Sequence, residues 1–370
     1  MSTDVIVVGG GLMGCAIALR LRQAGASVTV LERSIPGAEA SSAAGGILAP
    51  QKEAEGPGPL LDLGLRSRAL YPALAEELRE LSGLDIQYRP SGLLHVAFTE
   101  DAFQEMDATV AWQKAYGLRA ELLDVARARE LEPAISPSAL GAIHFPDDHQ
   151  VDNRLLVRAI SIAAARAGAE FRTGYVRGVV NQEDRVVGVD LDGQPLSAGA
   201  VVIAAGSWSG LVHGARIDPQ TVRPARGQMI ELSTRVPMFD RVLFSSRKGY
   251  LVPRRDGRIL AGSTLEFAGF EKDVTAAGVS RILAMALEMC PGLGEVRITD
   301  FWAGLRPYTD DHLPFIGPGP LPGLFLATGH YRNGILLTPI TARLVAESVL
   351  GQKPTMDLTP FRWDRTGART

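Results

Sequence analysis

Cysteine is scarce in this chain of 370 residues, which contains only Cys15 and Cys290. The two lie far apart and lack Cys-x-x-Cys spacing, which argues against a disulfide framework and a structural zinc site. Histidine is also sparse, with six residues that show no ligand spacing, so we expect no metal. Unpaired thiols fit a reducing compartment, and we therefore expect a cytoplasmic protein.

The chain has neither a charge surplus nor a long apolar run. Lys and Arg number 38 against 41 Asp and Glu, for a formal net charge of -3. This balance argues against nucleic acid and anionic membrane surfaces as partners. No segment approaches the ~20 apolar residues that span a bilayer, and the run 5–8 is too short for a signal peptide. We expect a soluble intracellular protein with no membrane partner.

A strand, a glycine-rich turn and a helix open the chain. The β-branched run Val5–Val8 predicts a strand buried on both faces. Glycines follow at once at positions 9, 11 and 14, in the spacing Gly-x-Gly-x-x-Gly. The stretch 12–23 has helical composition, and Gly25 is a plausible stop. A second strand is expected at 28–31, so the unit has the order typical of a dinucleotide site.

Each part of this unit has a physical role. Gly9 permits the tight turn, Gly11 lets the backbone approach a pyrophosphate, and Gly14 lets helix and strand pack closely. The helix N-terminus offers unpaired N–H groups and partial positive charge to the phosphates. Glu32 ends the second strand, where an acid accepts hydrogen bonds from ribose hydroxyls. This acid argues against NADP and leaves NAD and FAD open. The alternative is a glycine turn in an unrelated α/β protein, which would not need the flanking strands, the helix and the acid.

Further helices and strands are expected along the rest of the chain. The predicted helices are 60–81, 101–116, 124–132, 153–167, 281–289 and 334–350, and the predicted strands are 92–98, 176–180, 186–191, 201–206 and 324–327, with a strand-rich stretch that starts at 223–232 and reaches 265. The small residues 41–46 are either a flexible loop or a backbone that lies against a flat ligand. Nucleotide-type elements recur near the start, the middle and the end, so we expect two interleaved units.

Several motifs together resemble one family, the D-amino-acid-oxidase-like flavoproteins, and within it the bacterial glycine oxidases. The similarity extends over almost the whole chain. Besides the glycine motif, it is carried by Glu32-Arg33, Ser41–Leu48, Arg223–Gln228, Gly249–Arg254, Phe301–Pro307 and Gly329–Leu336.

The resemblance implies an α/β fold, α+β overall, with a split Rossmann-like FAD-binding domain interleaved with an antiparallel-sheet substrate domain. We expect the FAD-binding domain to comprise residues 1–87, 145–222 and 300–370, and the substrate-binding domain 88–144 and 223–299. Relatives form tetramers, so a homo-oligomer is expected by analogy.

The resemblance also implies bound FAD. Covalent members of the wider family attach the flavin through a Cys near the position of Arg306, and none occurs there, so non-covalent FAD is expected. The start of the last helix would stabilise negative charge on reduced flavin. The implied cofactor-binding residues are Gly9, Gly11, Leu12, Met13, Gly14, Glu32, Arg33, Ala40, Ser41, Gly45, Gly46, Ile47, Val176, Gly206, His330, Tyr331, Asn333, Gly334, Ile335 and Leu336.

Three residues are implied as the catalytic set. Arg306 would bind the substrate carboxylate, because guanidinium matches that group in bidentate fashion. Tyr250 would donate its hydroxyl to the same carboxylate, and Arg332 would set the local positive field. Without the resemblance, these would be interpreted as a surface arginine, a strand aromatic and an acid-paired or turn-capping arginine. His330 is expected to position or pack rather than to act as an acid or base.

The implied activity is oxidative deamination of glycine and small amines such as sarcosine and small D-amino acids. Hydride would pass from Cα to flavin N5, and O2 would be reduced to H2O2, with the imine feeding the thiazole branch of thiamine biosynthesis. Two alternatives stay open: a D-amino-acid dehydrogenase with a quinone-type acceptor, and the catalytic subunit of a hetero-oligomeric amine oxidase. Lys248, Tyr308 and Ile47 depart from the glycine-oxidase pattern near the pocket, which leaves the substrate open.

Overall fold

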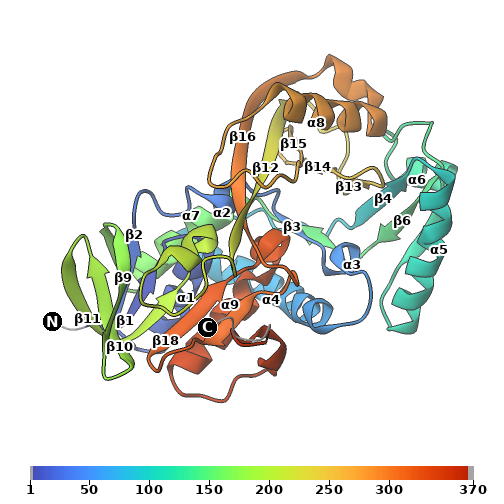
Figure 1. Ribbon diagram of the computed structural model, residues 1–370. Coiled ribbons are helices and arrows are strands. Elements are labelled where there is room, and N and C mark those ends of the chain that lie inside the picture. The colour runs from blue at the N-terminus through green and yellow to red at the C-terminus, as the bar shows by residue number, and fades with distance from the viewer. Residues whose placement is uncertain (1–2, 366–370) are drawn as a thin grey trace.

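The computed structural model describes residues 3–365 and contains two large sheets (Figure 1). The first sheet has eight strands, in the order β17-β18-β11-β1-β2-β8, with β10 and β9 attached beside β11. Its strands are β1 Thr3–Val8, β2 Val28–Glu32, β8 Glu170–Thr173, β9 Val176–Gln182, β10 Arg185–Leu191, β11 Gln194–Ile203, β17 Phe315–Pro318 and β18 Leu324–Thr328.

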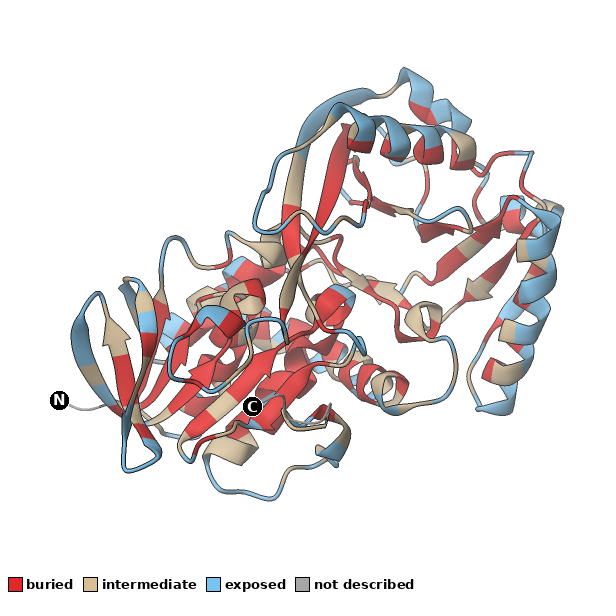
Figure 2. Cartoon of the chain, in the orientation of Figure 1, coloured by how far each residue is buried: buried red, intermediate tan, exposed pale blue. Residues whose placement is uncertain are grey.

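The central strand β1 pairs in parallel with β2 on one side and β11 on the other. Its apolar residues Val5–Val8 are buried, as a strand covered on both faces requires. Helices pack against this sheet and build its core, which Figure 2 shows in red. The helices of the whole chain are α1 Leu12–Gln23, α2 Ala40–Ala43, α3 Pro50–Glu53, α4 Pro59–Ser82, α5 Glu100–Ala115, α6 Val125–Leu131, α7 Asn153–Arg166, α8 Ala276–Met289 and α9 Gly334–Val349.

The second sheet also has eight strands, in the order β16-β12-β15-β14-β13-β4-β6-β5. Neighbours are antiparallel except β13 and β4, which run parallel. The strands are β4 Leu93–Ala97, β5 Glu121–Asp124, β6 Gly141–Phe145, β12 Arg223–Ser233, β13 Val242–Ser245, β14 Tyr250–Pro253, β15 Arg258–Gly262 and β16 Arg297–Tyr308. A two-stranded sheet, β3 Ile47–Leu48 with β7 His149–Gln150, and the short 3-10 helices η1 Gly206–Leu211, η2 Pro291–Glu295, η3 Tyr331–Asn333 and η4 Thr359–Phe361 complete the chain.

The mixed α/β class and the interleaved chain path are confirmed, because the chain enters each sheet more than once. The first sheet takes strands from 3–32, 170–203 and 315–328, and the second takes them from 93–145 and 223–308. The expected domain boundary at residue 300 falls inside β16, all of which belongs to the second sheet. The chain leaves the second sheet at the end of β16 and next enters the first sheet as β17. The remaining boundaries stay predictions.

The expected helices and strands are present, with shifts at their ends. The largest shift is in β11, which begins at Gln194 rather than at 201. α8 begins at Ala276 rather than at 281, because the Thr275 side chain caps it by accepting from the N–H of Gly278. After α1 the chain turns at Gly25, which has a φ of +90°. No helix within residues 3–365 is both long and apolar enough to cross a membrane.

Candidate active site

A cavity of about 1280 Å³ lies where elements of the two sheets meet, and both sheets contribute to its lining. From the first sheet come the glycine-rich turn after β1, the segment 37–47, and the turn from β18 into α9. From the second sheet come residues of β4, β12, β13, β14, β15 and β16. The volume exceeds the ~300–1,000 Å³ typical of a drug-sized ligand, so the cavity has room for a dinucleotide and a small second ligand.

The glycine-rich turn requires its glycines for two different reasons. Gly9 has a φ of +104°, and a Cβ there would lie 2.6 Å from the carbonyl oxygen of Ala204. A Cβ at Gly14 would lie 1.9 Å from the Gly9 carbonyl oxygen, so Gly14 permits the packing of helix on strand and lies outside the cavity lining. A Cβ at Gly11 would meet only Ser41 Oγ, at 3.7 Å, so this position opens onto the cavity.

Glu32 and Arg33 lie at one end of the cavity. Glu32 Oε2 accepts from the N–H of Gly10 (2.8 Å), which fixes the carboxylate beside the glycine turn. The Arg33 guanidinium lies 3.8 Å from the centroid of the Trp208 ring. Val176 and Trp208 also line this end. Sequence reasoning missed Trp208 as a site residue, although it follows Gly206 at the end of a buried strand.

The small-residue segment 41–46 is held in place rather than loose. The buried Arg254 donates to the carbonyl oxygen of Gly45 (3.0 Å) and to Asn153 Oδ1 (3.0 Å). Asn153 Nδ2 in turn donates to the carbonyl oxygen of Ser41 (2.9 Å). Gly46 has a φ of +74°, and a Cβ there would lie 2.1 Å from the Val151 carbonyl oxygen. These contacts favour the interpretation of segment 41–46 as a backbone that lies against a ligand over its interpretation as a flexible loop.

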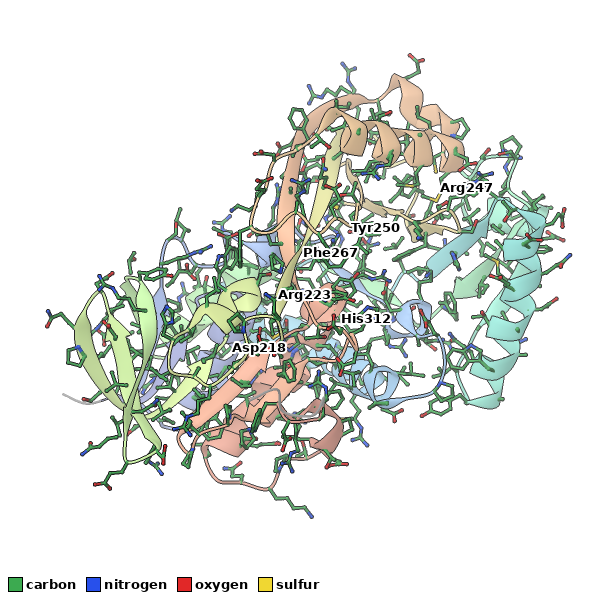
Figure 3. All side chains as sticks on the ribbon, in the orientation of Figure 1. Asp218, Arg223, Arg247, Tyr250, Phe267 and His312 are labelled. Atoms are coloured by element: carbon green, nitrogen blue, oxygen red, sulfur yellow. The ribbon has the colours of Figure 1, made fainter. Side chains whose placement is uncertain are left out.

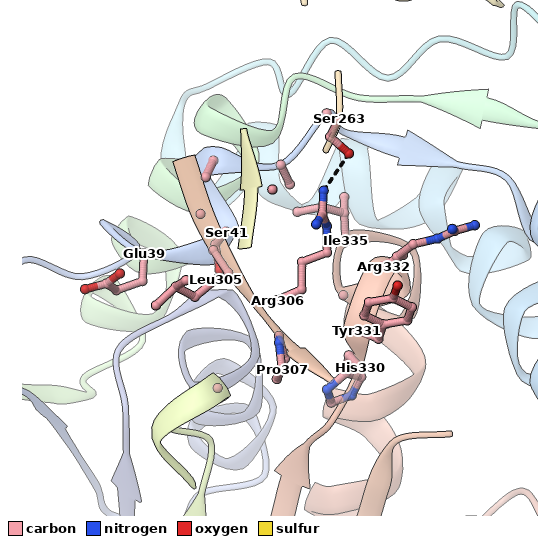
Figure 4. A pocket seen from close by; sticks show the side chains of 18 of the residues that line it. Glu39, Ser41, Ser263, Leu305, Arg306, Pro307, His330, Tyr331, Arg332 and Ile335 are labelled. Carbon is pink, nitrogen blue, oxygen red and sulfur yellow. Dashed lines mark hydrogen bonds between the residues drawn. The ribbon is translucent and has the colours of Figure 1, made fainter. Parts of the chain in front are cut away.

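Arg306 extends from β16 into the cavity (Figure 4). Its guanidinium donates to Ser263 Oγ and to the carbonyl oxygen of Thr264 (3.2 Å). Among residues 3–365, no carboxylate lies within 4.0 Å of it. Gly227, on the neighbouring strand β12, leaves the space for this side chain, since a Cβ there would lie 2.1 Å from Arg306 Nη2.

Tyr250 begins β14 and lies near the junction of the two sheets in Figure 3, whereas Arg247 lies farther out. Its ring packs on the backbone of Gly45, where a Cβ would lie 3.1 Å from Tyr250 Cε2. The hydroxyl donates weakly to Met229 Sδ (3.4 Å). The ring centroid of Phe244 lies 5.3 Å from that of Tyr250. The hydroxyl thus has no strong partner in the described chain.

Arg332 is paired with Glu53, so of the interpretations that the sequence left open the acid-paired arginine is present, although the sequence did not identify the acid. Its Nε donates to Glu53 Oε2 (2.9 Å), and the two groups form an ion pair. The Glu53 carboxylate is the main cause of a raised Arg332 pKa. In Figure 4 the Arg332 side chain extends away from Arg306. Its charge is therefore shared with Glu53 and is not wholly available to a ligand.

His330 is buried, and its Nε2 lies 3.1 Å from Thr341 Oγ1. Burial lowers the pKa of His330 to about 3, so the imidazole is neutral near pH 7. This suits a packing or positioning role. The chain then enters α9 at Gly334, so the helix N-terminus adjoins the cavity.

Most of the predicted site residues line this one cavity, including Arg306, Tyr250 and Arg332. The exceptions are Gly14 and Leu336, whose side chain is part of the core. Tyr308 also lies outside the lining and packs against Tyr331, with ring centroids 5.1 Å apart. Lining residues that sequence reasoning missed include Lys52, Glu53, His95, Trp208, Met229 and Phe244. In the described part of the chain, no three His, Cys, Asp or Glu residues group as metal ligands would.

The fold and the cavity define a class of protein. A dinucleotide-type parallel sheet lies at one end of the cavity, as in enzymes that bind a dinucleotide cofactor, and the same cavity contains Arg306, which has no acidic partner among residues 3–365. The chain belongs to the FAD dependent oxidoreductase family, whose model matches residues 4–348. The prediction of an FAD-dependent oxidoreductase is thereby confirmed.

Individual relatives agree with this placement. A glycine oxidase of Geobacillus kaustophilus is 38% identical, over 98% of this chain and 97% of the relative. The crystal structure of glycine oxidase from Geobacillus kaustophilus matches with a TM-score of 0.95 at 36% identity, covering 98% of this chain and 99% of that one. The bifunctional protein ThiO/ThiG of Synechocystis sp. is 40% identical over 95% of this chain, which spans only 52% of that relative.

Proposed function

We propose that this protein is an FAD-dependent oxidase that deaminates glycine and small amines such as sarcosine and small D-amino acids. The observation that carries the proposal is Arg306, whose guanidinium lies in the cavity with no carboxylate partner in the described chain. Arg306 is half-buried, and its only recorded acceptors in the described chain are the neutral oxygens of Ser263 and Thr264, so an anion that enters the cavity gains a charged partner there. A small substrate carboxylate supplies that anion in bidentate fashion.

The residues present fit FAD. Gly9, Gly11 and the start of α1 suit the pyrophosphate, since a side chain at Gly9 would collide with the backbone and Gly11 opens onto the cavity. Glu32 suits the adenosine ribose, and the fixed backbone of Gly45 and Gly46 suits the flavin ring. FAD, when bound, supplies the hydride acceptor at N5 and passes the electrons to O2, which yields H2O2. Cys15 and Cys290 are free and lie outside the cavity lining, which supports non-covalent binding.

The chain's own residues bind and orient the substrate. Arg306 holds the carboxylate, and Tyr250 donates its hydroxyl, which has only the weak acceptor Met229 Sδ in the described chain. Orientation by two such groups converts binding free energy into a productive approach of Cα–H to the cofactor. No strong base is required if the amine binds neutral, because its lone pair assists hydride departure. The buried, neutral His330 fits this account, since it serves packing and not proton transfer.

Peroxide release tests the proposal. Purified FAD-loaded protein is given glycine, sarcosine, D-alanine or D-proline in air. We expect peroxide from at least one of the four. No peroxide in air, with the flavin reduced by the same amines under anaerobic conditions, would favour the dehydrogenase alternative. No flavin reduction by any of the four would contradict the proposed substrate class.

The proposed metabolic role is supply of an imine to thiazole formation in thiamine biosynthesis. This rests on the resemblance and on the similarity to proteins named ThiO/ThiG, whose length this chain only half covers. A hetero-oligomeric amine oxidase subunit is a second candidate. It would be favoured if the isolated chain bound FAD and stayed inactive until a partner was co-expressed.

A further inference from the structure

Lys52 presents an ammonium group to the cavity and forms no ion pair with the part of the chain that the structure describes. It lies in α3, and its Nζ lies 4.9 Å from the centroid of the Phe244 ring. Its backbone N–H donates to Asp148 Oδ2 (3.0 Å), which anchors the residue. Within residues 3–365 the ammonium itself forms no ion pair and no hydrogen bond. Burial lowers the pKa of Lys52, which is the mark of a charge held away from water.

A second polar side chain lies beside it. His95, in β4, is paired in register with Phe244 of β13, so the two residues are neighbours across the sheet. His95 lines the same cavity, and its ring forms no hydrogen bond with the described residues. Burial, with a smaller effect of the Lys52 charge, lowers the pKa of His95 to about 3. The neutral imidazole can therefore donate one N–H to an anion that Lys52 attracts.

The cations near the substrate end of the cavity are unequally paired. Arg306, Arg332 and Lys52 are cations. Three acids act on Lys52: Glu53 is paired with Arg332, Asp148 is paired with Arg68, and Glu55 is exposed, and none of them forms an ion pair with Lys52 in the described chain. These groups are close enough to influence one another: Glu53 and Arg332 act on the pKa of Lys52. Tyr250 is paired with Gly262, the residue before the Ser263 that accepts from Arg306. The Tyr250 ring lies 5.3 Å from that of Phe244, over which Lys52 lies. One substrate carboxylate on Arg306 leaves Lys52 without a counter-ion.

We propose that Lys52 and His95 form a second anion subsite, which takes the distal carboxylate of an amine substrate that carries two carboxylates. This rests on the proposed function, in which Arg306 binds the first carboxylate. A dicarboxylate neutralises both unpartnered cations at once, whereas glycine neutralises one. Lys52 is then a specificity-determining residue: it discriminates among amines without taking part in the hydride step.

Binding of unreactive acids tests the subsite apart from turnover. The FAD-loaded protein is titrated with malonate, succinate and glutarate, and with acetate, propionate and butyrate, which are the same acids with hydrogen in place of the second carboxylate. The perturbation of the flavin visible spectrum gives each dissociation constant. We expect at least one dicarboxylate to bind about tenfold tighter than its monocarboxylate, as a paired partly buried charge implies. Equal affinity of every pair would overturn the proposal.

Variants then assign the effect to Lys52. In Lys52→Met the preference for the dicarboxylate should fall about tenfold, and Lys52→Arg should retain most of it. Lys114→Met, which removes a charge from the exposed face of α5, is the matched control and should leave the preference as in the wild type. A preference that survives Lys52→Met would overturn the assignment.

Turnover links the subsite to substrate choice. The substrate pairs are iminodiacetate against sarcosine, and D-aspartate against D-asparagine, in which the second carboxylate belongs to a carboxymethyl group attached to nitrogen or to Cα. We expect kcat/KM to favour the dicarboxylate member of one pair, and Lys52→Met to abolish that advantage. If glycine and sarcosine reduce the flavin but neither pair shows a Lys52-dependent difference, the subsite is wrong and the proposed function stands. If no amine reduces the flavin, the proposed function fails, and the acid titration still decides the subsite.

Discussion

The guanidinium of Arg306 lies directly against Gly227 on the neighbouring strand, and a Cβ at position 227 would come within 2.1 Å of Arg306 Nη2. This relationship explains a glycine in the interior of β12, where a residue without a side chain is otherwise unfavourable. It also lets Arg306 reach Ser263 and Thr264 across the adjacent strand. The space left by the missing side chain at Gly227 therefore sets the position of Arg306, the proposed carboxylate anchor.

Gly227→Ala should displace Arg306 while leaving the fold intact. The atom that would clash is the far end of a flexible side chain, so the guanidinium moves rather than the strand. We expect KM for glycine to rise about tenfold, because a displaced guanidinium contacts the substrate carboxylate less well and loses ~1.4 kcal/mol or more of binding free energy. Steady-state kinetics measures this. Gly294→Ala is the control, because a Cβ there meets only ordinary contact at 3.7 Å. An unchanged KM in Gly227→Ala would show that Arg306 does not anchor the substrate.

Arg306→Ala should have a larger effect of the same kind. Removing the partner of a buried carboxylate costs about 3–5 kcal/mol, so kcat/KM for glycine should fall by roughly 10²- to 10⁴-fold while FAD stays bound. Arg306→Lys should recover only part of the loss, because a lysine cannot make the bidentate contact. A kcat/KM for Arg306→Ala that stays near the wild-type value would place the substrate carboxylate elsewhere.

Arg254 should control FAD affinity through the backbone of Gly45. It is buried and joins that carbonyl oxygen to Asn153, so Arg254→Met frees the segment proposed to lie along the flavin. We expect the FAD dissociation constant to rise about tenfold or more, measured by fluorescence titration of the apoprotein. Arg255→Met is the matched control, since Arg255 is largely exposed and forms only a surface ion pair with Asp85. Equal FAD affinity in both variants would contradict this positioning role.

His330 should make stability depend on pH in the acid range. Its pKa is about 3 in the fold against an ordinary 6.5, so the unfolded chain binds the proton first as pH falls. The stabilisation from the neutral ring is thus fully present above pH 6.5 and is lost progressively toward pH 3. Between pH 7 and pH 5, protonation of His330 in the unfolded chain should lower the free energy of unfolding by about 2 kcal/mol.

Urea unfolding at pH 7 and pH 5, with saturating FAD, measures the His330 effect. In His330→Asn the difference in the free energy of unfolding between pH 7 and pH 5 should shrink by about 2 kcal/mol, whatever the variant's absolute stability. A difference equal to that of the wild type would mean that His330 titrates normally in the fold.

The sequence allowed one end of the cavity to be predicted well. The strand, the glycines at 9, 11 and 14, and Glu32 lie within one short stretch, so local order alone brings them together. Arg306 could be assigned only through the family motif around it. Its environment depends on the pairing of β12 with β16, which no local pattern specifies.

Other site features depend on contacts between distant segments. Arg332 and Glu53 are 279 residues apart, and their ion pair could not be inferred from spacing. Lys52 lies in a helix of only four residues, which carries too little periodicity to predict. His95 lies within a predicted strand, but its position beside Phe244 follows from a parallel pairing of β4 with β13. Charge balance in the cavity is visible only when these segments are assembled.

The central claim is that the cavity oxidises glycine-type amines through a carboxylate held by Arg306. The most direct test is the visible spectrum of FAD-loaded wild type and Arg306→Ala after anaerobic addition of glycine. The account predicts that glycine bleaches the oxidised flavin band of the wild type, and that Arg306→Ala bleaches only at far higher glycine concentrations. Persistence of the oxidised band in the wild type at saturating glycine, sarcosine and D-alanine, or equal bleaching of both proteins by glycine, would contradict it.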